Sequence, residues 1–188
     1  GSGVCAGVSP SSEAWVIDTK RLRHISLDAE RARVTVGAGV IGERLERWLN
    51  AQGVSLGHFP SSIYCSTVGG WVAARSAGQL SSRYGKIEDL VVSLEGVDGR
   101  GERVRASLDD PATGPGALRL LVGSEGALCV ITRVTLRVHA LASHRWLRGF
   151  RFEGLAPAVR ALQAVMQEGH APSVLRLYDP LDAVLAGG

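Results

Sequence analysis

His58 is the residue of this chain best suited to moving protons near neutral pH. It stands two positions before Pro60, at the entry to a loop rich in serine and glycine. The ordinary pKa of imidazole lies close to neutrality, so a histidine on a loop can serve as a general acid or base. The alternative is a histidine that only hydrogen-bonds to its surroundings, and the sequence leaves both interpretations open.

Arg176 is the second candidate for chemistry. Apolar residues surround it in the segment 174–178, which predicts a strand carrying a buried or half-buried guanidinium. Because an unpaired buried cation is costly, we expect an anion beside it. A planar guanidinium binds phosphate or carboxylate through two parallel hydrogen bonds, which favours a substrate anion. A salt bridge inside the same domain is the alternative.

Small residues concentrate in residues 1–7, 61–70, 76–78 and 123–126. Glycine adopts positive φ and lets a ligand approach the backbone closely, and consecutive amides form an anion-binding concavity. The four segments together predict a pyrophosphate site, although each one alone is equally consistent with a simple turn. The chain has no GxxxxGKS or GxxxxGKT motif and no GxGxxG between a strand and a helix, which excludes a P-loop and a Rossmann site.

Cysteine usage argues against a metal or redox centre. Cys5, Cys65 and Cys129 are odd in number, lie far apart and form no CxxC pair. This spacing does not suit zinc or a redox dithiol, so we expect no metal site and a reducing, cytoplasmic environment. A lone cysteine usually acts as a small apolar side chain, which is the interpretation for Cys5 and Cys129.

The composition is that of an ordinary soluble domain. Hydrophobic residues make up 45% and charged residues 21% of the 188 positions, and the net charge is only +3. These values exclude the disordered and fibrous classes and give no sign of nucleic-acid binding. No apolar run approaches the roughly 18 residues that a membrane span requires, so we expect no transmembrane segment.

The hydrophobic periodicity predicts an α+β fold. Short β-type runs at residues 15–17 and 34–36 precede a helix over residues 41–49. An apolar run at 90–97, closed by the turn DGRG and followed by residues 102–106, predicts a hairpin. Residues 134–138 alternate apolar and polar, which predicts a strand with one buried face at the edge or in an outer layer of a sheet.

A second domain is predicted to follow the first. Residues 145–152 and 174–178 have strand character, and an amphipathic helix over 155–166 lies between them. This β-α-β order divides the chain into a domain at residues 1–142 and the start of another at residues 143–188.

Several separated motifs together resemble one known family. They are GHFPSS at residues 57–62, STVGGW at 66–71, SAG at 76–78, RYGKIED at 83–89 and LVGSEGAL at 121–128. In this order they resemble the FAD-linked oxidases, the vanillyl-alcohol oxidase or PCMH-type FAD-binding superfamily, and most nearly its alkyldihydroxyacetonephosphate synthases. The resemblance covers nearly the whole chain. It implies a PCMH-type two-subdomain FAD-binding module followed by the start of an α+β substrate or cap domain.

The resemblance also implies FAD as a non-covalent cofactor and assigns residues to it. Residues 61–67 would follow the pyrophosphate and flavin, residues 75–78 would line the cofactor, and residues 125–131 would contact its adenosine half. The catalytic candidates are His58, facing the flavin, and Arg176, which matches an arginine important for activity in the synthases. The assigned cofactor-binding residues are Gly1, Ser2, Gly3, Val4, Pro60, Ser61, Ser62, Ser66, Thr67, Gly69, Gly70, Arg75, Ser76, Gly78, Glu125, Gly126, Val130 and Ile131.

Two features depart from the family pattern, and a third, Cys65, lies where some relatives carry a cysteine. The chain opens at Gly1, inside what resembles the tail of the first pyrophosphate loop, so we expect an N-terminally truncated module. Cys129 stands where the family usually has glycine, and it either crowds the backbone or is an accepted variant. Cys65 lies two residues before Thr67, where some relatives bond a cysteine to the flavin, although a small buried side chain is the simpler interpretation.

The resemblance leaves three functions open. The first is an FAD-dependent oxidoreductase in which the flavin accepts hydride from a hydroxylated substrate resembling a 2-hydroxy acid. The second is a synthase-like transferase of ether-lipid synthesis, with a lipid-like substrate. The third is a truncated, non-catalytic fragment. The expected partner is a small-molecule substrate and not a nucleic acid, and a homodimer of the full-length protein is an open alternative.

Overall fold

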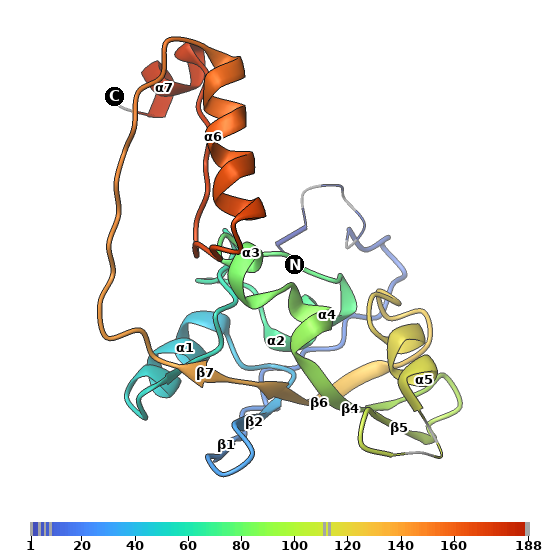
Figure 1. Cartoon of the computed structure of the whole chain (residues 1–188). Coiled ribbons are helices and arrows are strands. Elements are labelled where there is room, and N and C mark those ends of the chain that lie inside the picture. The colour runs from blue at the N-terminus through green and yellow to red at the C-terminus, as the bar shows by residue number, and fades with distance from the viewer. Residues whose placement is uncertain are drawn as a thin grey trace.

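A five-stranded antiparallel sheet organises the chain (Figure 1). The computed structural model describes residues 2–3, 5, 7, 9–110, 112 and 114–186. The strand order in the sheet is β1-β2-β6-β4-β5, and a separate two-stranded ribbon pairs β3 with β7. The strands are β1 (Ile25–Asp28), β2 (Arg33–Gly37), β3 (Val54–Ser55), β4 (Val91–Val97), β5 (Arg103–Ser107), β6 (Val130–Arg137) and β7 (His139–Ala140).

Strand β6 lies at the centre of the sheet, which corrects the edge position, one of the two positions that the sequence predicted. The predicted alternation itself is confirmed, because Val134 and Leu136 are fully buried while Arg133 and Arg137 are exposed. Alternation reports that a strand has one covered face, and it does not report how many strands flank it. Neighbours on both sides, β2 and β4, make β6 central.

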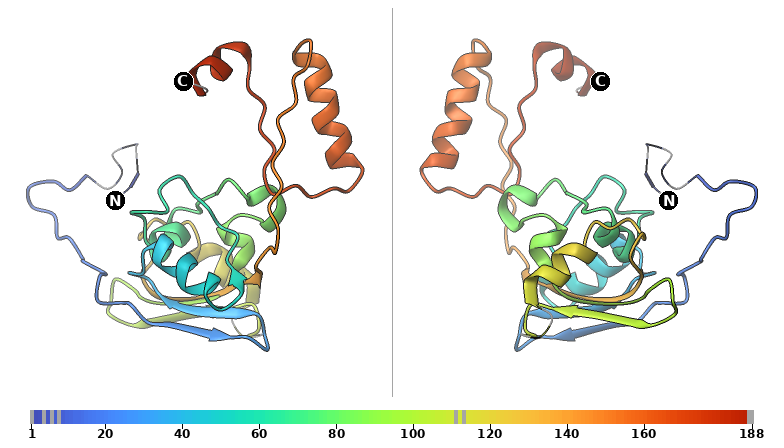
Figure 2. Two further views of the ribbon diagram at one scale, coloured as in Figure 1. Left: turned by 90° about the vertical axis from the view of Figure 1, so that its left-hand side faces the viewer. Right: turned by 90° about the vertical axis from the view of Figure 1, so that its right-hand side faces the viewer.

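Helices cover one face of the sheet and leave the other face open (Figure 2). The predicted first helix is confirmed as α1, which buries Leu45 and Leu49 completely against the sheet. Val34 and Val36 of β2 and Leu94 of β4 line the same core. The helices are α1 (Gly42–Asn50), α2 (Val68–Ala73), α3 (Ser81–Tyr84), α4 (Ile87–Leu90), α5 (Gly114–Leu121), α6 (Leu155–Gln167) and α7 (Pro180–Ala186).

Three predicted strands are not formed. No strand forms at residues 15–17, 145–152 and 174–178. A strand requires backbone hydrogen bonds to a neighbouring strand, and these segments make no such bonds among the described residues. The predicted helix between the last two is confirmed as α6, which projects away from the sheet with α7 (Figure 1). None of the described helices is long and apolar enough to cross a membrane.

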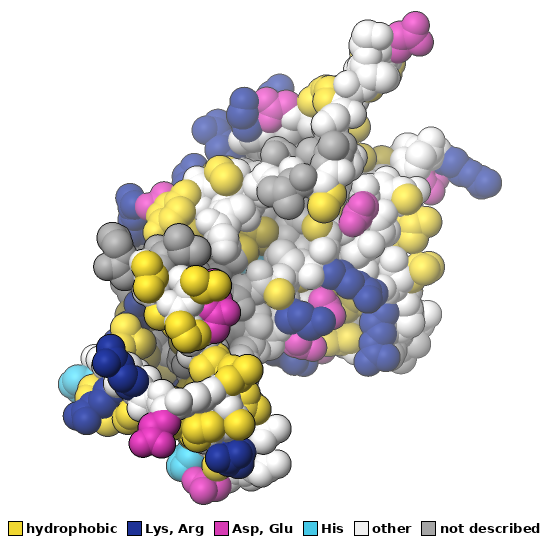
Figure 3. Space-filling model, turned by 90° about the horizontal axis from the view of Figure 1, so that it is seen from above, with side chains coloured by type: hydrophobic (Ala, Val, Ile, Leu, Met, Phe, Trp, Pro, Cys, Tyr) yellow, Lys and Arg dark blue, Asp and Glu magenta, His cyan; other side chains and the backbone are white. Residues whose placement is uncertain are grey.

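The projecting C-terminal part exposes large apolar side chains. Trp146, Leu147 and Phe150 are each at least three-quarters exposed, and Ala158 is the one buried residue of α6. Hydrophobic side chains gather on this part of the molecule in the end-on view of Figure 3. The core of the fold therefore lies in the sheet and the helices that cover it.

Cys129 is buried in the core beside β4. The residue is 3% exposed, and burial raises the pKa of its thiol. Its Sγ lies beside Gly96 of β4, where an added Cβ would come within 3.0 Å of Sγ and 2.9 Å of the Val130 carbonyl oxygen. The absence of a side chain at Gly96 therefore provides the space that the thiol fills.

We expect Gly96→Ala to destabilise the chain, because the methyl group would overpack the contact with Cys129. The expected loss is about 1–3 kcal/mol of unfolding free energy, measured by urea denaturation. Gly99→Ala is the matched control, because a Cβ there meets no atom within 4 Å. Equal stability of the two variants would contradict this account of the packing.

Candidate functional site

The serine- and glycine-rich loop is held against the connection between β2 and α1. Val68 and Gly69 donate backbone hydrogen bonds to the carbonyls of Val40 and Ala38, both at 2.9 Å. Thr67 caps α2, its hydroxyl accepting a hydrogen bond from the Gly70 amide at 3.2 Å. Serine and threonine suit this position because the hydroxyl satisfies an amide that has no partner inside the helix. The loop thus joins the helical layer by backbone contacts.

Glycines 42 and 69 serve close packing, and neither opens a cradle for a ligand. A Cβ at Gly69 would lie 2.6 Å from the Cβ of Ala38, and one at Gly42 would lie 2.0 Å from the ring of Trp71. Gly70 differs, because it is exposed and an added Cβ would meet only the Thr67 hydroxyl, at 3.3 Å. The sequence assigned Gly69 and Gly70 to the cofactor, and of these two only Gly70 is open to a ligand.

The serines of this loop have different roles. The Ser66 hydroxyl accepts from Trp71 Nε1 at 2.7 Å and from the Ser62 hydroxyl at 3.0 Å, and it donates to the Ser62 carbonyl at 2.7 Å. Ser66 is therefore a fully satisfied buried group that anchors the loop. In the described part of the chain, the amides of Ser61 and Ser62 donate to no acceptor. Two adjacent free amides are donors that an anion can use.

His58 is buried, with only 1% of its surface exposed. Its Nε2 lies 2.7 Å from the Ser76 hydroxyl, and its ring meets the Trp71 ring edge-on at 4.9 Å. Burial lowers the pKa of His58 to about 4, since desolvation penalises the charged form. The imidazole is therefore neutral near pH 7, and its surroundings match the hydrogen-bonded structural alternative. A catalytic role for His58 stays an untested prediction.

A second loop, residues 75–78, packs against the first. A Cβ at Gly78 would lie 2.6 Å from the Phe59 amide nitrogen, and Gln79 donates to the Phe59 carbonyl at 2.9 Å. Together with the contact between Ser76 and His58, these close approaches fix the two predicted cofactor loops to each other. Gly78 is required by this packing.

Arg75 connects α2 to the third predicted segment. Its Nε donates to the Val122 carbonyl and its Nη2 to the Arg119 carbonyl, both at 2.9 Å, at the end of α5. The chain then returns to α2, as Gly123 and Glu125 donate to the carbonyls of Val72 and Ala73. Arg75 has a positive φ of 49°, which a residue other than glycine adopts only where its surroundings hold it. The guanidinium thus positions residues 123–126.

Residues 123–126 leave one buried hydroxyl unsatisfied. In the described part of the chain, Ser124 Oγ is buried and has no partner, while Glu125 and Gly126 are exposed. Val130 and Ile131 belong to β6, and Ile131 is 6% exposed within the core. Ile131 can therefore reach a ligand only through its backbone. The sequence prediction did not name Ser124, although its place between Gly123 and Glu125 was a usable signal.

Other predicted site residues lie apart from these three segments. Ser2 and Gly3 are exposed, and Gly1 and Val4 lie outside the described residues. Arg176 is exposed in an irregular segment, with Nη1 3.1 Å from the Tyr178 hydroxyl. The prediction that Arg176 is buried on a strand is therefore wrong, because the segment has no strand neighbour to cover it. Cys65 is also exposed, and the described residues contain no group of three or more potential metal ligands.

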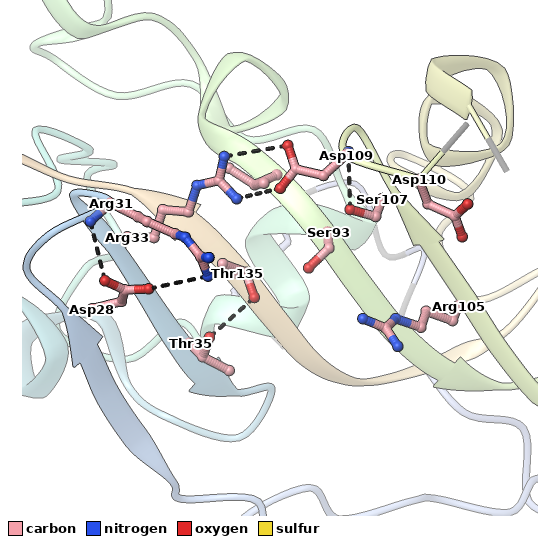
Figure 4. Close-up of a pocket in the computed structure, with 11 residues that line it drawn as sticks. Asp28, Arg31, Arg33, Thr35, Ser93, Arg105, Ser107, Asp109, Asp110 and Thr135 are labelled. Atoms are coloured by element: carbon pink, nitrogen blue, oxygen red, sulfur yellow. Dashed lines mark hydrogen bonds and ion pairs between the residues drawn. The ribbon is translucent and has the colours of Figure 1, made fainter. Parts of the chain in front are cut away.

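The open face of the sheet carries a separate polar hollow (Figure 4). Arg33 pairs with Asp109 there, and the hydroxyls of Thr35 and Thr135 lie 3.1 Å apart. The Arg33 guanidinium holds the pKa of the Asp109 carboxyl below its usual value. No predicted site residue lines the hollow. The candidate site is therefore on the helical side of the sheet, where the predicted segments 58–70, 75–78 and 123–126 meet around α2.

The residues around α2 fit the cofactor that the resemblance implies. They combine adjacent free amides at Ser61 and Ser62, an exposed glycine at position 70 and an unsatisfied hydroxyl at Ser124. Such groups suit a large ligand that has a diphosphate and many acceptor atoms, because buried polar groups normally find partners. An FAD molecule has this chemistry.

Comparisons with known proteins agree with the implied cofactor. A family described as FAD binding domain matches residues 1–107. The chain is 35% identical to alkyldihydroxyacetonephosphate synthase of Dictyostelium discoideum, over 99% of this chain and 31% of the relative. It is 40% identical to the FAD-linked oxidoreductase YgcU of Escherichia coli K12, over 84% and 33%, and 35% identical to D-lactate dehydrogenase of Archaeoglobus fulgidus, over 73% and 31%.

A solved structure of alkyldihydroxyacetonephosphate synthase is similar with a TM-score of 0.77 and 33% identity, over 90% of this chain and 31% of the other. The PCMH-type fold expected from the sequence is therefore confirmed. The chain spans about one third of the length of these relatives.

We expect Arg75→Lys to loosen residues 123–126, because lysine cannot form both hydrogen bonds of the guanidinium. The amides of Gly123 and Glu125 should exchange with solvent deuterium about 5 to 30 times faster, which corresponds to a loss of about 1–2 kcal/mol. Arg119→Lys is the control, since it keeps the carbonyl that Arg75 binds. Unchanged amide exchange in Arg75→Lys would show that the hydrogen bonds of Arg75 do not hold residues 123–126 in place.

Proposed function

The chain belongs to the FAD binding domain family, and from this premise we propose that it forms the flavin-holding part of an FAD-linked oxidoreductase acting on a hydroxylated substrate. FAD is the cofactor of the family. The observation that carries the proposal is the convergence of three loops on α2. In the described part of the chain, the amides of Ser61 and Ser62 in the first of these loops have no acceptor.

The residues of the site have separable tasks in this proposal. The amides of Ser61 and Ser62 bind the pyrophosphate, and the exposed Gly70 lets the cofactor lie close to α2. Arg75 acts indirectly, by holding residues 123–126 in place. FAD, when bound, supplies the acceptor for a hydride from the substrate. We propose that it is held without a covalent bond.

Substrate binding is assigned to the second domain, which we propose begins at residue 143. Arg176 is exposed there and free of any carboxylate among the described residues, so its guanidinium is available to a substrate carboxylate or phosphate. Relatives named D-lactate dehydrogenase and glycolate oxidase subunit support a 2-hydroxy acid as substrate.

A second candidate function is a transferase like alkyldihydroxyacetonephosphate synthase. The observation in its favour is the extent of the similarity, which covers 99% of this chain for the Dictyostelium enzyme and 90% for the solved synthase structure. A lipid-like substrate with a phosphate group would also suit Arg176. Substrate tests separate the two candidates, because 2-hydroxy acids bleach bound flavin only in the oxidoreductase.

We expect the chain to bind FAD, as measured by equilibrium dialysis with detection of flavin absorbance. Ser61→Pro removes one free amide and should weaken binding by about 5- to 30-fold, which corresponds to about 1–2 kcal/mol. Ser61→Ala keeps the amide and should bind like the unaltered chain, because the side chain of Ser61 is exposed. Absence of binding by the folded, unaltered chain would favour the non-catalytic alternative.

We expect Arg176→Lys to lower turnover while the content of bound flavin stays unchanged, because lysine lacks the planar pair of donors. Turnover is measured in the full-length flavoprotein with D-lactate, glycolate and acyl-dihydroxyacetonephosphate. Arg160→Lys, an exposed change on α6, is the control. Flavin loss in Arg176→Lys would make Arg176 a structural residue.

A further inference from the structure

The two ring nitrogens of His58 have different surroundings. Nε2 lies 2.7 Å from the Ser76 hydroxyl. Nδ1 is buried and has no hydrogen-bond partner in the part of the chain that the structure describes. The histidine is 1% exposed and packs edge-on against Trp71, so water has little access to either nitrogen.

This asymmetry determines which nitrogen carries the proton. Burial keeps His58 neutral near pH 7, so the ring has one N–H and one bare nitrogen. A buried N–H without an acceptor costs about 1–3 kcal/mol, and proteins tolerate an unsatisfied acceptor more readily than an unsatisfied donor. The proton is therefore on Nε2, and the Ser76 hydroxyl oxygen accepts it.

The consequence concerns the hydrogen of the Ser76 hydroxyl. Because Ser76 accepts from His58, its own hydrogen is left to donate elsewhere, and no acceptor for it lies among the described residues. Ser76 is half-buried on the 75–78 loop, which the contacts of Gly78 and Gln79 with Phe59 fix in place. Its hydroxyl is thus a pre-oriented donor inside the candidate cofactor site.

We propose that the Ser76 hydroxyl donates a hydrogen bond to an acceptor atom of bound FAD, and that His58 is a positioning residue that orients this hydroxyl. This inference rests on the proposed function, since it requires FAD to bind between the loops around α2. In this proposal His58 does not transfer a proton. Its Nε2–H donates to Ser76, and the serine O–H donates to the cofactor. Because the Ser76 hydroxyl is already oriented before FAD binds, part of the entropic cost of binding is removed.

The first test reads the tautomer directly. Nuclear magnetic resonance of the chain labelled with ¹⁵N-histidine should show His58 as a neutral ring protonated at Nε2, with and without FAD. A ring protonated at Nδ1, or a charged ring at pH 7, would overturn the proposal whether or not FAD binds.

The second test measures FAD affinity by equilibrium dialysis. Ser76→Ala should weaken binding about 5- to 30-fold. His58→Leu should weaken it by a smaller factor, because the hydroxyl is kept but is free to turn. The double variant should be no weaker than Ser76→Ala alone, because His58 acts on binding only through the Ser76 hydroxyl. His58→Gln should restore most of the affinity, since its amide nitrogen reaches the position of Nε2.

Ser82→Ala on α3 is the matched control, because Ser82 is exposed and outside the loop. Thermal unfolding confirms that each variant is folded. Unaltered binding by folded Ser76→Ala, with normal binding by the parent chain, would overturn only the Ser76 assignment. Failure of the parent chain to bind FAD would instead overturn the proposed function.

Discussion

The close approach of α2 to the β2–α1 connection is the contact on which the rest of the site depends. Gly69 makes it possible, because its amide reaches the Ala38 carbonyl at 2.9 Å and any Cβ would lie 2.6 Å from the Cβ of Ala38. A side chain at this position would push α2 outward. Thr67 at one end of the helix and Arg75 at the other would move with it, so both flanking loops would lose their positions.

From this fixed helix, side chains hold the neighbouring loops on both sides. On one side Trp71 and Ser66 anchor the serine-rich loop, and on the other Arg75 anchors residues 123–126. Most polar groups around α2 are used in these contacts. The few that stay free, among them the amides of Ser61 and Ser62, are therefore available to a cofactor without competition from the protein.

In the C-terminal part, structure forms from local hydrogen bonds with little tertiary contact. Helix α6 forms because its hydrogen bonds are local, and it does so with one buried residue, Ala158. The flanking segments 145–152 and 174–178 have the composition of strands, but strand hydrogen bonds must come from another segment. Arg176 is consequently exposed where its apolar neighbours predicted burial.

The sequence by itself determined the features that depend on local pattern. Alternation predicted the buried face of β6, helical spacing predicted α1 and α6, and the ordered glycine motifs predicted the FAD-binding fold that the comparisons confirm. Only the tertiary structure decided which strand is central, which glycines serve packing and which side chains are buried. His58 shows the reason: its role depends on the burial and hydrogen bond that Trp71 and Ser76 provide, and residue spacing along a chain carries no record of such contacts.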